Sequence, residues 1–229
     1  MLILSLETST ESGSCALFYD GQVLERNCPL GRSHSETLLP LVRELMLEAG
    51  VKFSQLDAIA FGAGPGAFTG LRVACGVAQG LAVASDLPLI PVTSLETMAV
   101  MAGGKQVLAL LDARMGEVYA ATYRVDGDLA VLLGEIRVSS PNEVLLPEGD
   151  DWMACGNALT AYPLLLERII TVNRVFRPEI LPTAATVARI AVPRFLRGEG
   201  IDPAMAAPLY IRDKVAKTVA ERLGEGGKA

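Results

Sequence analysis

Short apolar runs alternate with polar turns along the chain, and the first of them predict a three-stranded meander. Residues 2–6 (LILSL) form an apolar run of strand length, and residues 7–14 form a polar turn. Residues 15–27 predict two further strands, because Asp20-Gly21 between them is a strong signal for a β-hairpin. We therefore expect the chain to open with three antiparallel strands.

A helix is expected next, over residues 31–50. Ser33 and Glu36 have the spacing of a capping box at its start, and Gly50 has the place of a C-terminal stop. Pro40 lies inside the helix and should kink it, because proline removes one backbone hydrogen bond and clashes with the preceding turn.

Strands and helices then alternate. Residues 56–62 (LDAIAFG) predict a buried strand, and a helix follows over 69–85. Residues 88–92 (PLIPV) predict a further buried strand, followed by a helix over 94–102 with Ser94 as its cap.

The order of elements repeats after a loop at residues 103–105 (GGK). The second half is expected to contain three strands over 106–138 with a hairpin at Asp126-Gly127, a short helix over 142–146, a strand over 152–156, and helices over 158–169 and 183–198, the last interrupted at Pro193. The pattern predicts an α/β protein with a duplicated βββαβα unit. This is the plan of the actin-like ATPase (ASKHA) superfamily, with two subdomains at 1–104 and 105–229 and a loose tail from about residue 217.

Composition and charge narrow the function. The chain has 229 residues, of which 51% are hydrophobic, and its net charge is −6. Nucleic-acid binders usually carry a basic surface that neutralises phosphates, so we expect no direct, tight binding of tRNA or DNA. The four cysteines show no CxxC spacing, and no metal or cofactor is expected.

No segment predicts secretion or membrane insertion. The first ten residues lack a basic region and include Glu7. The apolar run from Val73 to Ser85 is shorter than the ~18 residues of a membrane span. We therefore expect a cytoplasmic protein without a membrane contact.

A glycine-rich loop between a strand and a helix raises the question of a nucleotide site. Residues 62–67 (GAGPGA) match the Rossmann pattern GxGxxG/A. However, Asp86 precedes the next strand, where the pattern requires an acid after it, and Pro65 removes an N–H group that phosphate would need. Leu71 and Arg72 stand where a P-loop requires lysine and a hydroxyl residue. The loop therefore fits neither template.

The helix after the loop is apolar on nearly all sides. Arg72 and Gln79 are its strongly polar residues, whereas Gly76 and Gly80 lie four apart on the side away from the sheet. Each glycine inside a helix costs about 0.5–1 kcal/mol relative to alanine. Two explanations remain open, namely close packing inside one subdomain and close approach of helices from another protein.

The earlier helix supports an interface with another protein. Leu38, Val42 and Leu45 have the spacing to face the core, whereas Leu39 and Met46 lie on a different flank. The two helices should be neighbours and form half of a four-helix contact. The predicted interface residues are Leu39, Met46, Arg72, Val73, Gly76, Gln79 and Gly80.

Several stretches resemble the TsaB (YeaZ) family. They read FGAGPGAFTGLRVACGVAQGLA (61–82), LDARMGEVYAA (111–121) and PLYIRDKVA (208–216), together with LSLETSTESGSCAL (4–17) and SHSETLLPLV (33–42). The resemblance spans almost the whole chain and implies an actin-like fold. It also implies a bacterial cytoplasmic protein that is needed to make threonylcarbamoyladenosine in tRNA.

The resemblance further implies partners and a non-catalytic role. Family members bind the catalytic paralogue TsaD, which transfers the threonylcarbamoyl group, and act with the ATPase TsaE. The TsaB–TsaD contact is a helical bundle from both first subdomains, and TsaB alone self-associates through the same surface. Contact with tRNA would then be indirect, through the complex.

The sequence departs from the catalytic paralogue where that protein binds metal. Its HxxxH pair aligns with Ser94 and Met98, which form no normal site for a hard metal ion. The sole histidine of the chain is His34, at a helix start, where a capping or surface role is more common than metal binding. We therefore expect no metal site.

Two enzymatic functions are the alternatives to a scaffold. An actin-fold ATPase or kinase would place Glu7, Thr8 and Ser9 at the first phosphate loop, with Asp112 opposite. A peptidase would have to use His34 between two serines, an arrangement that does not assemble a triad. For weak anion or nucleotide contact, the candidate residues are Glu7, Thr8, Gly64, Gly66 and Asp112.

Overall fold

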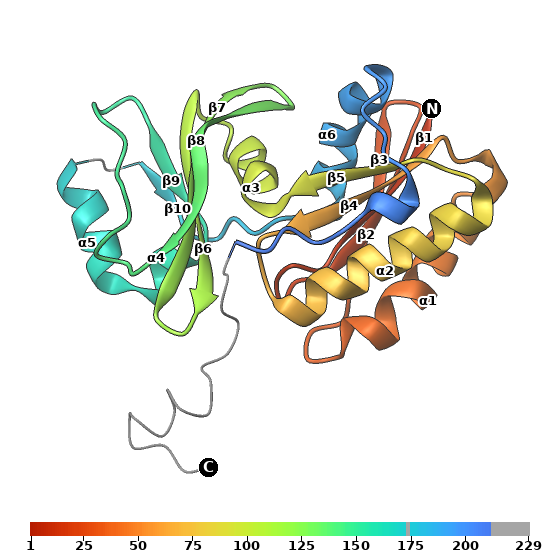
Figure 1. Cartoon of the computed structure of the whole chain (residues 1–229), viewed down its shortest axis with the longest axis horizontal. Coiled ribbons are helices and arrows are strands. Elements are labelled where there is room, and N and C mark those ends of the chain that lie inside the picture. Colours follow the sequence, from red (N-terminus) through yellow and green to blue (C-terminus); the bar gives the residue numbers. More distant parts are fainter. Residues whose placement is uncertain (173–174, 212–229) are drawn as a thin grey trace, which may run out of the picture.

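Two five-stranded mixed sheets with the same topology form the framework of the protein (Figure 1). The computed structural model describes residues 1–172 and 175–211. The first sheet has the order β3-β2-β1-β4-β5 and the second the order β8-β7-β6-β9-β10. Their strands are β1 (Leu2–Glu7), β2 (Ser14–Tyr19), β3 (Gln22–Asn27), β4 (Ala58–Gly64), β5 (Leu89–Thr93), β6 (Gln106–Arg114), β7 (Glu117–Asp126), β8 (Leu129–Ser139), β9 (Met153–Cys155) and β10 (Phe176–Arg177). The predicted duplication of a βββαβα unit is confirmed in its strand order.

Both hairpins predicted from Asp-Gly pairs are present. Asp20 and Gly21 both have positive φ angles, of 47° and 80°, as a two-residue type I′ turn requires. They join β2 to β3, whose register pairs Tyr19 with Gln22. The second predicted pair, Asp126-Gly127, lies at the turn between β7 and β8.

Helices cover both faces of the first sheet. One face packs against α1 (His34–Glu48) and α2 (Phe68–Ser85), which are neighbours of each other as predicted. Leu38, Val42 and Leu45 of α1 are fully buried in this layer. The opposite face packs against α6 (Ala184–Leu196), which comes from the end of the second half.

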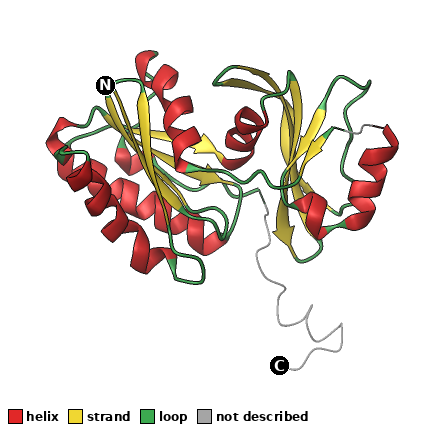
Figure 2. Ribbon diagram, turned by 180° about the vertical axis from the view of Figure 1, so that it is seen from behind, coloured by secondary structure: helices red, strands yellow, loops and turns green. Residues whose placement is uncertain are grey.

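The two halves exchange their last helices. The helix α3 (Ser94–Ala102) follows the last strand of the first sheet but packs on the second sheet, against β6 and β7. Conversely, α6 follows the last strand of the second sheet and packs on the first (Figure 2). The expected boundary at residue 104 therefore separates the strands of the two sheets along the chain. It does not separate the helices, because α3 packs on the second sheet and α6 packs on the first.

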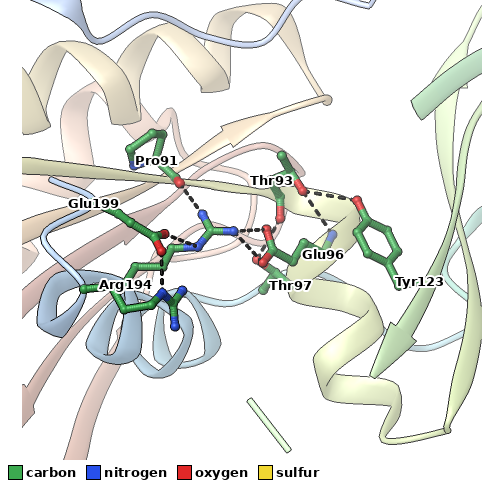
Figure 3. Close-up of polar contacts among 8 residues, drawn as sticks. Pro91, Thr93, Glu96, Thr97, Tyr123, Arg194 and Glu199 are labelled. Carbon is green, nitrogen blue, oxygen red and sulfur yellow. Dashed lines mark hydrogen bonds and ion pairs between the residues drawn. The ribbon is translucent and has the colours of Figure 1, made fainter. Parts of the chain in front are cut away.

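An ion pair joins the two exchanged helices (Figure 3). The Arg194 guanidinium donates to both carboxylate oxygens of Glu96, at 2.6 and 2.8 Å, and to the carbonyl oxygen of Pro91 at 2.7 Å. The Glu96 side chain is 7% exposed. Burial raises the pKa of Glu96, and the guanidinium of Arg194 opposes that shift. The Tyr123 hydroxyl, 3.3 Å from the Thr93 hydroxyl, connects this network to β7.

The chain returns to the first sheet after α6. Ile201 forms an antiparallel bridge with Leu89, and a short 3-10 helix (Pro203–Met205) packs on α2. The Leu209 N–H then donates to the carbonyl oxygen of Ala63 at 2.7 Å. A second 3-10 helix (Phe53–Gln55) precedes β4. The proposed loose tail from residue 217 lies outside the described residues.

Three predicted helical features are wrong, and proline explains them. Residues 142–146 are not helical, because Pro141 and Pro147 enclose a segment too short to nucleate a helix. The helix expected over 158–169 is two helices, α4 (Ala158–Ala161) and α5 (Pro163–Val172), since the residue before Pro163 avoids the helical region. By contrast, α6 is not interrupted at Pro193, which lies in its last turn and loses one hydrogen bond there.

The predicted caps are also partly wrong. Ser33 precedes α1 but makes no side-chain capping bond, because its hydroxyl bonds that of Ser35 at 2.7 Å. The cap of α3 is Thr93, one residue before the predicted Ser94. The C-terminal stop of α1 at Gly50 is confirmed by its positive φ of 67°.

The exchanged-helix ion pair generates a stability prediction. Arg194→Met would leave the buried Glu96 carboxylate without its cation, so we expect the free energy of unfolding to fall by about 3–5 kcal/mol. Urea unfolding at pH 7 measures this change. The matched control is Arg137→Met, which breaks the exposed pair with Glu135 and should cost less than about 1 kcal/mol. Equal losses in the two variants would contradict a special role for the ion pair.

Candidate functional site at the outer helices and the cleft

The outer surface of α1 and α2 includes exposed apolar side chains and glycines that no other part of the described chain covers, and α1 also exposes Arg43, Glu44 and Glu48 there. We call it the α1–α2 face and define it by Leu39 and Leu47 on α1 and by Gly76, Gly80 and Val83 on α2, all of which are exposed. Figure 1 shows the two helices side by side on the outside of the first sheet. Val83 is 70% exposed, although burial of its side chain would be favourable.

Internal packing does not explain the two glycines of α2. A Cβ atom added at Gly76 or Gly80 would meet no heavy atom within 4 Å. Alanine would therefore fit at both positions and would stabilise the helix by about 0.5–1 kcal/mol each. The alternative that these glycines serve close packing inside one subdomain is wrong.

The other predicted interface residues have mixed positions. Leu39 is exposed and Val73 is half-buried against the core. Met46 is 3% exposed and packs in the core beneath the helices, so its predicted position on an accessible flank is wrong. Helical spacing alone did not separate it from the core face, because the buried stripe of α1 is wide enough to include both Leu45 and Met46.

Two of these residues hold the returning C-terminal segment. Gln79 donates from Nε2 to the carbonyl oxygens of Pro203 and Ala206, at 2.9 and 3.1 Å. Arg72 donates from Nε to the Tyr210 hydroxyl at 3.0 Å. Both therefore have a structural role within the chain, whether or not they also contact a partner.

By length and composition alone, α2 would be able to cross a membrane. It has 18 residues with a mean hydropathy of 1.2, and 33% of them are buried within the protein. The uncharged apolar run from Val73 to Ser85 is shorter than a membrane span, but the helix begins at Phe68 and includes Arg72, so the helix itself reaches that length. Helices packed on a sheet pass the same test, and α2 packs on β4 and α1.

The glycine-rich loop between β4 and α2 is packed against the end of β1. A Cβ at Gly66 would lie 2.4 Å from the Ser9 carbonyl oxygen, and one at Gly70 would lie 1.9 Å from that of Thr8. The Thr8 hydroxyl also donates to the Gly70 carbonyl oxygen at 2.7 Å. Gly64 has a φ of 106°, which favours glycine. These glycines therefore allow close approach of the protein's own backbone.

The first-strand acid is buried beneath this loop. Glu7 is fully buried, and its Oε1 accepts a hydrogen bond from the Ser9 backbone N–H. Its Oε2 has no partner among the described residues. Burial raises the pKa of Glu7, although hydrogen bonds from Ser9 and Thr8 oppose the shift. Burial therefore disfavours the charged form of Glu7 relative to a glutamate in water.

A small cavity of about 70 Å³ lies in the cleft between the two halves. Of the five candidate anion contacts, Gly66 and Asp112 line it from opposite sides, whereas Glu7, Thr8 and Gly64 do not. Asp112 is already engaged, since its Oδ1 accepts from the Arg114 N–H at 2.9 Å and the Tyr162 hydroxyl at 2.8 Å. Burial and the hydrogen bond to Asp112 raise the pKa of Tyr162 to about 12.

An aromatic cluster beside the cleft was not predicted from the sequence. The Arg72 guanidinium lies 3.7 Å from the centre of the Phe68 ring, and the Phe68 and Tyr210 ring centres are 5.6 Å apart. The spacing of Phe68 and Arg72, four apart on one helix, was the available signal. Tyr210 joins them from 138 residues further along the chain than Arg72, which no local pattern indicates.

The described residues contain no group of three or more His, Cys, Asp or Glu side chains placed to hold a metal ion. Ser94 and Met98 are fully buried in α3. His34 is half-buried, with Nε2 at 2.9 Å from the Thr10 carbonyl oxygen and Nδ1 without a partner in the described part of the chain. Its serine neighbours bond each other instead.

Comparison with known proteins identifies the family. The family described as TsaD, tRNA N6-adenosine threonylcarbamoyltransferase, matches residues 29–218. The Escherichia coli tRNA threonylcarbamoyladenosine biosynthesis protein TsaB is 37% identical, with 94% of this chain and 96% of that protein covered. The Haemophilus influenzae protein of the same name is 34% identical over 94% and 95% of the two chains.

Solved structures agree with this match. YeaZ from Pseudomonas aeruginosa is 39% identical, and it superposes with a TM-score of 0.83 over 91% of this chain and 99% of that one. A Pseudomonas aeruginosa protein described as similar to peptidase YeaZ gives a TM-score of 0.85 at 39% identity, over 92% and 99% of the two chains. The chain therefore belongs to the TsaB (YeaZ) family of tRNA threonylcarbamoyladenosine biosynthesis proteins and has the actin-like fold of two related halves.

Proposed function

We propose that this protein is a non-catalytic scaffold in tRNA threonylcarbamoyladenosine modification. In this account it binds the catalytic paralogue TsaD through the α1–α2 face, and it acts together with the ATPase TsaE in the cytoplasm. The observation that carries the proposal is the uncovered apolar face around Gly76 and Gly80, where side chains would fit but are missing.

The α1–α2 face lowers the stability of the isolated chain. Each glycine weakens α2 by about 0.5–1 kcal/mol, and no contact within the described chain offsets this loss. Small residues four apart let another helix approach the backbone closely and gain dispersion contacts along its length. Helices of a partner would also cover Val83 and Leu47, which are 70% and 77% exposed. In the absence of TsaD, a second copy of this chain would use the same face to form a homodimer.

The cleft supports a non-catalytic role. Its cavity of about 70 Å³ is far below the roughly 300–1,000 Å³ of typical small-molecule sites. Magnesium binds carboxylate oxygens, and burial disfavours the charged carboxylate of Glu7. These observations favour the scaffold over an ATPase or kinase. The net charge of −6 favours indirect contact with tRNA, through the complex.

Side chains added at the two glycines of the α1–α2 face should stabilise the fold when small and block partner binding when large. Gly76→Ala and Gly80→Ala should each raise the free energy of unfolding by about 0.5–1 kcal/mol, because both sites have open space for a Cβ. Gly76→Leu or Gly80→Leu should leave the fold intact but block close approach of a partner helix. Gel filtration and calorimetry with purified TsaD measure the complex.

A matched control separates the face from a general surface effect. Leucine at Gly127, in the exposed turn between β7 and β8, would be a poor control because that residue has a positive φ. Ala161→Leu, at an exposed helical position of the second half, is suitable and should not change binding. Undiminished binding of TsaD to both α2 variants, with the fold intact, would refute the assignment of this face.

The raised pKa of the buried Glu7 predicts a specific dependence of stability on pH. The unfolded chain releases the proton of a glutamate near pH 4.3, whereas the folded state keeps it to a higher pH. The folded state then holds more protons, so the contribution of Glu7 is complete below that pH and is lost as pH rises through the folded pKa. Glu7→Gln cannot lose a proton and should remove this decline.

Urea unfolding between pH 5 and pH 7 checks the prediction. The wild-type protein should lose stability over this interval relative to Glu7→Gln. Glu11→Gln serves as the control, because Glu11 has an exposed side chain on the following loop, and it should parallel the wild type. Parallel curves for wild type and Glu7→Gln would show an ordinary carboxylate and would restore Glu7 as a magnesium ligand.

A further inference from the structure

Three stretches that are distant in sequence converge on one apolar pocket beside the cleft. The pocket has a volume of about 190 Å³ and lies between the start of α2, the turn between β6 and β7, and residues 209–211. These stretches are parts of the three sequence motifs that first suggested the family. The function proposed above uses the α1–α2 face and gives this pocket no role.

The pocket is built to hold an apolar group. Its lining includes three side chains that are at most 8% exposed, namely Leu71, Ala113 and Tyr119. Its rim includes three large side chains that are more exposed, namely Phe68, Met115 and Tyr210, with Met115 at 64%. Aromatic residues, methionine and arginine are enriched at protein interfaces. The pocket is smaller than a typical small-molecule site, so its size suits one anchoring side chain of another protein.

Two guanidinium groups lie at the pocket. Arg72 stacks on Phe68 and uses its Nε–H for the Tyr210 hydroxyl, and it has no ion pair with a described residue. Arg114 lines the pocket with a side chain that is 77% exposed, and its nearest carboxylate oxygens, on Asp112 and Glu11, are at 3.3 and 3.9 Å. Guanidinium groups pair with carboxylates in preference to neutral groups. Asp112 and Glu11 already pair with Arg114. Arg72, which lies beside the pocket against Phe68 and Tyr210, therefore supplies the positive charge that is complementary to an acidic residue.

The turn that carries part of the rim is strained. Arg114 and Met115 have φ angles of 60° and 54°, a region that residues other than glycine, asparagine and aspartate avoid. A two-residue hairpin turn of this kind favours Asn-Gly, so Met115 is a poor choice for the turn itself. Backbone strain of this kind persists at sites of function. Met115 lies at the rim of the pocket, and a role of its side chain there would explain why a methionine stands at this unfavourable turn position.

We propose that this pocket receives a protein segment that presents one apolar side chain next to an Asp or Glu carboxylate. The apolar side chain enters between Phe68, Met115 and Tyr210, and the carboxylate pairs with Arg72. Phe68 and Arg72 belong to α2, so the pocket extends the α1–α2 face towards the second half. The inference rests on the proposed function, because the segment belongs to the same catalytic partner.

A nucleic acid fits these observations less well. Single-stranded bases stack on open aromatic faces, but the Arg72 guanidinium already covers one face of Phe68. Glu11 and Asp112 lie close to Arg114 and would repel a phosphate.

The test measures binding of purified TsaD to the full-length chain by calorimetry. Met115→Asp places a charge at the apolar rim and should raise Kd about tenfold or more. Met115→Gly removes the side chain but also relieves the backbone strain, so Kd should rise several-fold while the melting temperature does not fall. Arg72→Gln should also raise Kd and should reduce the dependence of Kd on salt. The control is Leu196→Asp, which changes a 73% exposed residue on α6, on the opposite side of the first sheet, and should leave Kd within twofold.

The outcomes separate this inference from the function on which it rests. If Gly80→Leu abolishes the complex while Met115→Asp, Met115→Gly and Arg72→Gln bind as tightly as wild type, the pocket assignment is wrong and the proposed function stands. If the wild-type chain forms no complex with TsaD, both are overturned. If the pocket variants keep the protein complex but weaken its binding of tRNA, the occupant is a nucleic acid and the inference is overturned.

Discussion

The exchange of α3 and α6 between the two sheets is the constraint on which the rest of the structure depends. Each helix leaves the half in which its strands lie and covers the sheet of the other half. The Glu96–Arg194 ion pair joins them where they meet, and its burial makes a lone partner costly. Because one face of each sheet is covered by a helix from the other half, the relative position of the halves is built into both cores. The cleft and the pocket beside it depend on that position.

Much of the fold was predictable because its signals are local. Asp20-Gly21 specifies a hairpin through two positive φ angles, and Gly127 has a positive φ in the turn between β7 and β8. The repetition of three strands followed by alternating helices and strands predicted two related sheets, and the strand orders confirm this. The glycine-rich loop was predicted to fit neither nucleotide-binding template, and in the structure its glycines pack against Ser9 and Thr8. The errors lie in the helical segments next to Pro147, Pro163 and Pro193 and at the caps of α1 and α3.

The candidate sites were less predictable because they depend on contacts between distant residues. Helical spacing placed Gly76 and Gly80 on an open surface, but it placed Met46 there as well, and Met46 is in the core. No local pattern brings Tyr210 to Arg72 or Met115 to the start of α2. Burial of Glu7 shows how such contacts change chemistry, since its pKa is raised by surroundings that the sequence does not reveal.

The central claim is that the outer side of α1 and α2 is covered by a partner. Hydrogen–deuterium exchange of the full-length chain, with and without purified TsaD, tests it most directly because it reports each helix separately. We expect slower exchange in α1 and α2 when TsaD is bound, and unchanged exchange in α5 of the second half. Unchanged exchange in α1 and α2, in a complex shown to form, would contradict it.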